Sequence, residues 1–213
     1  MVRPVPLPRR PLDAAGPDGN GPEGAARHAR DARVRGWYEN ELGWATVPGE
    51  PVRLLVGERF DVLEVPAEAG HAALGRLAPG FPVAVQGGTG GSGGRMRLLV
   101  AAGSAEELPG ILRWLEWGTL PLDLTALGEG CLMEAPVPSG LVPGCRRHGP
   151  VQGAAVWVRP PVAGCGAEAS LPTVSALGGV RDAPDLVRLV DTLAAHCHRV
   201  RLRRLAAQPL AFS

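Results

Sequence analysis

The segment from Asp182 to Leu205 carries the apolar stripe that most constrains how this chain folds. Apolar side chains recur there at intervals of three and four, which is the period of an α-helix with one buried face. The stripe consists of Leu186, Leu189, Val190, Leu193, Cys197 and Val200. Such a face needs a second apolar layer to cover it. Asp182 is the expected N-cap of this helix, and Pro184 fits its first turn.

The preceding sequence supplies that second layer as short β-rich runs separated by glycine-rich turns. "WATVP", "VRLLVGERFDVLEVP", "FPVAVQGG", "RMRLLVAA", "LDLTALGEGCLMEAPVPSG" and "GAAVWVRPP" predict strands, and the third and fourth of these predict a hairpin around "TGGSGG". Further helices are expected before Gly43, over 67–78 and over 104–118. Ser104 and Glu107 form a possible capping box for the last of these helices. The order predicts an α+β fold in which helices pack on a mixed sheet.

Residues 1–30 consist of proline, glycine and charged residues with almost nothing to bury, and they predict a disordered tail. The remaining residues, 31–213, have the size of one ordinary domain. No apolar run reaches the roughly 18 residues that a membrane span needs, and no apolar signal core follows the first basic residues. We therefore expect a cytoplasmic protein that has no membrane partner.

Cysteine and histidine residues give only weak evidence for a zinc site. The four cysteines are far apart in the sequence, which is typical of reduced thiols. Cys145 and His148 have a ligand-like spacing, but structural zinc sites present tighter paired motifs. His196, Cys197 and His198 are adjacent on the predicted last helix, where neighbouring side chains point in different directions.

The net charge of +1 means that any contact with nucleic acid must come from a local basic patch. The end of the last predicted helix is the first candidate. It carries Arg199, Arg201, Arg203 and Arg204. A solvated basic face, favoured by the helix dipole, explains the same residues without a ligand.

Four segments, in this order, resemble the successive signatures of the bifunctional DNA primase/polymerase N-terminal domain, the Prim-Pol group of archaeo-eukaryotic primases. They are "LGWATVPG", "VGERFDVLEVP", "GGRMRLLV" and "LDLTALGEGCLMEAPVPSG". The chain is most similar to short actinobacterial proteins that carry this domain alone, and the resemblance spans roughly Arg35 to Pro161. It implies an RRM-like catalytic half joined to a smaller α/β half, with the active site in the cleft between them.

The resemblance also implies a metal site, and here the sequence departs from the family pattern. Nucleotidyl transfer uses two divalent ions held by carboxylates, Mg²⁺ or Mn²⁺ if this chain is active. Where the family has two aspartates separated by one residue, this chain has Glu64 and Pro66. Asp123 matches the third metal aspartate. Asp61 is three residues from Glu64, which places the two acids on opposite faces of a regular strand.

A further departure lies in the "GGR" segment, where the family has a phosphate-binding histidine. This chain has Met96, which offers no useful donor. Arg95 and Arg97 flank it and are candidate nucleotide and phosphate ligands, although surface charge on a strand is an equally good explanation.

We therefore expect a Prim-Pol-like domain with a degenerate metal site, which holds no cofactor and binds a nucleotide, single-stranded nucleic acid or a regulatory partner. Glu64 is expected to pair with Arg95 or Arg97 across adjacent strands. One alternative is an active primase/polymerase in which Glu64, Asp123 and either Asp61 or Glu129 hold metal. Another is a protein-interaction module with an exposed apolar patch around Trp114, Trp117 or Val137–Val142.

Overall fold

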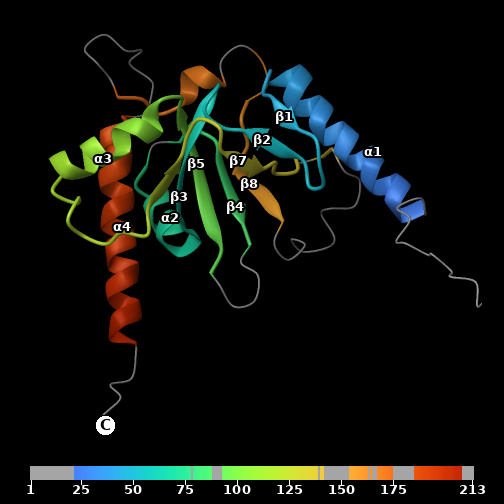
Figure 1. Ribbon diagram of the computed structural model, residues 1–213. Helices are drawn as coiled ribbons and strands as arrows, with labels where there is room; N and C mark the ends of the chain where they lie inside the picture. The colour runs from blue at the N-terminus through green and yellow to red at the C-terminus, as the bar shows by residue number, and fades with distance from the viewer. Residues whose placement is uncertain are drawn as a thin grey trace, which may run out of the picture.

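A five-stranded antiparallel sheet forms the centre of the fold in this computed structural model (Figure 1). The structure describes residues 22–77, 79–87, 93–138, 140–141, 154–162, 164, 167–174 and 185–207. The strand order is β6-β3-β5-β4-β8. The strands are β3 (Phe60–Pro66), β4 (Val83–Gln86), β5 (Arg95–Ala101), β6 (Thr125–Leu127) and β8 (Ala155–Arg159).

Six successive elements of this layer form a βαββαβ unit: β3, α2 (Ala67–Leu74), β4, β5, α3 (Ser104–Trp114) and β6. Within the unit β3 and β5 are the central strands, and the expected β4–β5 hairpin is present. β8 extends the sheet beside β4. The α+β class predicted from the sequence is confirmed. The mixed sheet is not, because all pairings between the named strands are antiparallel.

Helices α2, α3 and α4 (Leu186–Ala206) cover one face of the sheet (Figure 1). The stripe predicted for the last helix is buried there, and Leu186, Leu189 and Leu193 are almost completely inaccessible. The N-cap is Asp185, whose side chain accepts a hydrogen bond from the Val187 amide at 2.9 Å. Asp182, the expected cap, lies outside the described residues. The last turns of α4, residues 201–207, are exposed.

The other face of the sheet is covered by a smaller three-stranded sheet with the order β1-β2-β7. Its strands are β1 (Thr46–Val47), β2 (Arg53–Leu55) and β7 (Leu132–Glu134). The core between the two sheets contains Tyr38, Trp44 and Phe60, whose rings contact one another in sequence. Tyr38 donates a hydrogen bond to the Pro136 carbonyl at 2.6 Å and accepts one from Trp157 Nε1 at 3.0 Å.

Because β3 is covered on both sides, its side chains alternate between two cores. Leu63 and Val65 pack toward the helices, whereas Phe60 and Val62 pack toward the smaller sheet. This alternation explains why the strand reads as a continuous apolar run apart from its two acids. Glu64 therefore projects from the same face as Val62.

Helix α1 (Pro22–Gly36) begins before Asp31, where the sequence placed the start of the folded chain. The helix expected before Gly43 is therefore present, and its end is anchored by the buried Val34 and Tyr38. Residues 25–30 are exposed, so the start of the helix carries no apolar stripe that a sequence pattern reveals. It continues into a π-helical turn, η1 (Trp37–Glu41), and a short 3₁₀ turn, η2 (Glu168–Ser170), lies between β8 and α4. Residues 1–21 of the predicted tail lie outside the described residues.

One prediction about α3 is corrected. The capping box is absent: the N-cap is Gly103, which makes no side-chain cap, and Ser104 is buried. Pro109 lies inside the helix. Of the two tryptophans that follow, Trp117 packs against the helix-side core, while Trp114 is 74% exposed. None of the helices in the described ranges is long and apolar enough to span a membrane.

Candidate functional site

Glu64 lies at the centre of a polar cluster on the sheet face that is turned away from α2, α3 and α4. It stands opposite Arg97 of β5 and Thr125 of β6 in the strand register. Directly opposed residues of antiparallel strands project to the same face, and residues two apart along one strand do so as well. Arg97 and Arg95 therefore both flank Glu64.

Each carboxylate oxygen of Glu64 accepts a hydrogen bond from a different arginine. Arg95 Nε lies 3.0 Å from Oε1, and Arg97 Nε lies 2.8 Å from Oε2. Arg95 continues the chain of ion pairs, because its Nη1 donates to Asp123 Oδ1 at 2.6 Å. The expected pairing of Glu64 with an arginine is thus present, and it involves both candidates. We call these four residues the arginine–carboxylate cluster.

Burial makes these ion pairs stronger than surface contacts. The side chains of Arg97 and Glu64 are only 14% and 17% exposed, while that of Asp123 is 48% exposed. Burial opposes the charge of Arg95, but hydrogen bonds and charges from Asp123 and Glu64 outweigh it and raise the pKa of this guanidinium. Arg95 is therefore a fixed cation held between two carboxylates.

The acids that would have to bracket a metal ion do not all converge. Asp61 is buried on the helix side of β3, where its Oδ2 accepts a hydrogen bond from the Ala105 amide at 2.8 Å. It caps α3, so it lies on the opposite face from Glu64, as the strand period predicts. The backbone of Glu129 packs directly against Gly57. A side chain at position 57 could not be accommodated, because its Cβ would lie 2.2 Å from the Cα atom of Glu129. Among the described residues, no group of three or more His, Cys, Asp or Glu side chains is arranged to hold a metal.

Met96 is buried on the helix side of the sheet, where its side chain packs against Gly70 of α2. A Cβ at Gly70 would lie 2.3 Å from the Met96 sulfur, so this contact leaves no free space. A side chain at position 96 therefore points away from Glu64. The neighbours that share the face of Glu64 are Arg95 and Arg97, and they are the residues of this strand that can act at the cluster.

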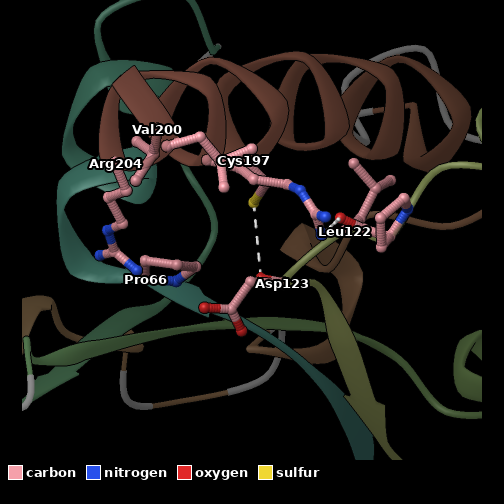
Figure 2. A pocket seen from close by; sticks show the side chains of 9 residues that line it. Pro66, Leu122, Asp123, Cys197, Val200 and Arg204 are labelled. Carbon is pink, nitrogen blue, oxygen red and sulfur yellow. Dashed lines mark hydrogen bonds between the residues drawn. The ribbon is translucent and has the colours of Figure 1, made fainter. Parts of the chain in front are cut away.

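Asp123 also lines a groove of about 370 Å³ beneath the C-terminal part of α4 (Figure 2). The carboxylate of Asp123 points away from the helix, and its backbone carbonyl faces the Cys197 sulfur. The thiol donates to that carbonyl across 3.6 Å, and burial raises the pKa of Cys197 to about 12. This thiol is consequently protonated and unreactive at neutral pH. The sequence had named Asp123, Arg201 and Arg204 as separate candidates, but it gave no sign that they line one groove.

The four candidate arginines of α4 do not act as one patch. Arg201 and Arg204 line the groove. Arg203 instead forms an ion pair with Glu68 of α2 at 2.6 Å. Arg199 is exposed and does not line the groove. The basic end of the helix is therefore divided between a ligand-accessible part and a part that ties α4 to α2.

The histidines of α4 do not form the zinc site that their spacing had raised as a possibility. His196 is buried, and its Nε2 has no partner among the described residues. The ring of His198 instead lies against Trp117, with 6.0 Å between the ring centroids. Cys145 and His148 lie outside the part of the chain that the structure describes.

Comparison of this chain with protein-family models, with curated proteins and with solved structures finds no match. The resemblance to the Prim-Pol group therefore rests on the four sequence segments alone. In the structure these segments contain β1, β3, β5 and the pair β6 and β7. Three of the four contribute a residue to the arginine–carboxylate cluster.

Proposed function

We propose that this chain is a Prim-Pol-like domain that binds the phosphates of a nucleotide or of single-stranded nucleic acid without a metal ion and without nucleotidyl transfer. One observation carries the proposal: the guanidinium of Arg95 contacts both Glu64 and Asp123, the two carboxylates expected to hold metal. An arginine occupies the space between them that a divalent ion would need.

The topology supports the scaffold part of this proposal. The unit from β3 to β6 has the βαββαβ order, with the spatial order β6-β3-β5-β4. An RRM-like half is expected to have this arrangement. The β1-β2-β7 sheet would then correspond to the smaller half, and Glu64 lies on the face of the larger sheet that is turned toward it.

Charge balance supports the loss of metal chemistry. Two-ion catalysis needs a surplus of carboxylates that attracts both cations. In the cluster, Glu64 and Asp123 are matched by Arg95 and Arg97, so their formal charges sum to zero. A divalent ion would have to displace a guanidinium from hydrogen bonds of 2.6 to 3.0 Å.

Arg97 supplies the donor that a phosphate needs. Its Nε is used by Glu64, but its Nη1 is buried and has no acceptor among the described residues. A buried guanidinium N–H without an acceptor is unfavourable, and a phosphate oxygen that displaced the side chains covering Arg97 would satisfy it. In this arrangement Glu64 holds both arginines in position, and it has no role as a metal ligand.

The test is calorimetric titration of the purified protein with a deoxynucleoside triphosphate, with Mn²⁺ and with a chelator. We expect the same affinity under both conditions, a loss of binding in Arg97→Ala, and no primer synthesis. Arg113→Ala is the matched control, because Arg113 is exposed on α3. Binding that requires Mn²⁺ and disappears in Glu64→Ala would show that the active enzyme is the correct alternative.

A second variant tests whether Arg95 takes the place of a metal. Arg95→Ala leaves Glu64 and Asp123 without the cation between them, so their mutual repulsion should be relieved by a divalent ion. We expect Mn²⁺ to bind this variant more tightly than the wild-type protein and to raise its thermal stability. Equal Mn²⁺ binding in both proteins would contradict the proposed replacement.

The protein-interaction alternative receives less support from the tryptophans on which it was based. Trp117 packs against the core and donates a hydrogen bond to Asp191 at 2.8 Å. Trp114 is exposed, but a single exposed aromatic residue is common on protein surfaces. Part of the segment Val137–Val142 lies outside the described residues.

A further inference from the structure

We propose that the groove beneath the C-terminal end of α4 is a second ligand site, which binds one nucleotide, either free or at the end of a single strand. This site is separate from Arg97 and shares only Asp123 with the arginine–carboxylate cluster. It has the same expected ligand class as the proposed function, so the experiment below is designed to separate the two.

One end of the groove is suited to a phosphate. Arg201 and Arg204 are three residues apart on α4, so their side chains lie on the same side of the helix. Arg201 is held in place because its Nη1 donates to the Pro121 carbonyl at 2.8 Å. Arg204 has no side-chain partner among the described residues. Asp123 in the groove is already neutralised by Arg95, and the two guanidinium charges exceed the charge of roughly −0.5 at a helix C-terminus, so the site attracts anions.

The walls of the groove are suited to a flat apolar ring. Pro66 lies at the end of β3 beside Arg204, and Leu122 lies at the other end of the groove (Figure 2). Val200 and Leu205 add apolar surface from the helix side, and Leu205 is 52% exposed. Arginine and proline side chains stack readily on nucleobases. The volume of about 370 Å³ lies at the lower end of the roughly 300 to 1,000 Å³ of small-molecule sites, so we expect a single nucleotide.

Asp123 gives the groove a preference among bases. Its Oδ1 accepts a hydrogen bond from Arg95, and its carboxylate points away from the helix, but the side chain is 48% exposed and can turn toward the groove that Asp123 lines. A carboxylate oxygen accepts hydrogen bonds and donates none, so it favours a base with an exocyclic amine. Cytosine and adenine have such a group, whereas thymine does not. We therefore expect deoxycytidine monophosphate to bind more tightly than thymidine monophosphate.

The experiment is calorimetric titration of the full chain with these two monophosphates and with inorganic phosphate, in the wild-type protein and in three variants. Arg204→Ala should weaken the binding of deoxycytidine monophosphate by roughly tenfold or more, because it removes a charged hydrogen-bond donor. Arg199→Ala is the control, since Arg199 is exposed on the same helix but does not line the groove, and it should change the affinity less than about twofold. Arg97→Ala should leave this site unchanged.

The outcomes distinguish the groove from the cluster. Nucleotide binding that is lost in Arg97→Ala but is unchanged in Arg204→Ala would overturn the groove and leave the proposed function standing. Loss of one site in Arg204→Ala and of a separate site in Arg97→Ala is the expected result and supports both, whereas loss in Arg204→Ala with no site lost in Arg97→Ala would support the groove and remove the cluster as a nucleotide site. No binding of any monophosphate or of a single-stranded oligonucleotide to the wild-type protein would overturn both. Equal affinity for the two monophosphates would overturn the base contact of Asp123.

A competition experiment decides whether the groove binds only free nucleotides or also the end of a single strand. A fluorescein-labelled single-stranded oligonucleotide is bound first, and its anisotropy is followed as deoxycytidine monophosphate is added. Displacement at the affinity measured for the free monophosphate indicates that the groove takes the end of a strand as well. Failure to displace, with the monophosphate still bound, restricts the groove to free nucleotides. Leu205→Glu is a further variant that should abolish binding by repulsion between its carboxylate and the phosphate, and because Leu205 is 52% exposed the exchange leaves the core intact.

Discussion

Replacing Glu64 with glutamine should destabilise the fold more than the exchange of an exposed glutamate for glutamine does. Glutamine keeps the shape of the side chain but removes its charge and one of its two acceptor oxygens. Glu64 contacts Arg95 at 3.0 Å and Arg97 at 2.8 Å, and Arg97 is only 14% exposed. A charged hydrogen bond contributes about 1.5 to 3 kcal/mol, and the guanidinium left behind stays partly buried. We expect the free energy of unfolding to fall by about 3 kcal/mol.

Urea unfolding followed by circular dichroism measures this loss directly, and the thermal midpoint should fall by roughly 6 to 12 °C. Glu58→Gln is the matched control, because Glu58 is exposed in the turn before β3. A double-mutant cycle that combines Glu64→Gln with Arg97→Met isolates the interaction between Glu64 and Arg97. It should give a coupling energy of about 1 to 2 kcal/mol. The reasoning is refuted if Glu64→Gln unfolds within about 0.5 kcal/mol of the wild-type protein, since the pairs would then behave as surface contacts.

Three further predictions concern stability. Asp61→Ala removes the acceptor of the Ala105 amide and should lower the free energy of unfolding by about 1 to 2 kcal/mol in urea titrations, with helix α3 exchanging its amide protons faster. Tyr38→Phe deletes the hydroxyl that donates to the Pro136 carbonyl, and calorimetry should show a loss of about 1 to 3 kcal/mol. Burial lowers the pKa of His196 below its ordinary 6.5. The unfolded chain therefore binds this proton first as the pH falls, and stability should decrease between about pH 7 and pH 5 in the wild-type protein but less in His196→Leu.

Periodicity alone was enough to locate the elements that carry most of the core. The apolar run of β3 records burial on both faces of the strand, and the stripe of α4 records burial of one face of the helix, which imposes a period of 3.6. The period of two along a strand correctly placed Asp61 and Glu64 on opposite faces. A helix before Gly43 was expected, but the start of α1 was missed because residues 25–30 are exposed and carry no such record.

The site could be predicted only where it depends on neighbours within one strand or across a hairpin. Glu64 and Arg97 are directly opposed in the register of β3 and β5. The sequence could suggest this pairing because both strands are regular and antiparallel neighbours. The contact between Arg95 and Asp123 and the groove beneath α4 depend on how segments far apart in the chain pack together. A single sequence contains no local pattern for such packing.

Asp123 links the two proposed sites, and this gives them a physical reason to influence each other. It is the most exposed member of the arginine–carboxylate cluster, and one of its oxygens already binds Arg95. A base that draws the carboxylate toward the groove would weaken that contact and leave Arg95 with Glu64 as its remaining acid partner. Coupling of this kind is reciprocal, so phosphate binding at Arg97 would change the affinity of the groove by the same factor. Asp123→Asn should therefore reduce the coupling without removing the arginines of either site.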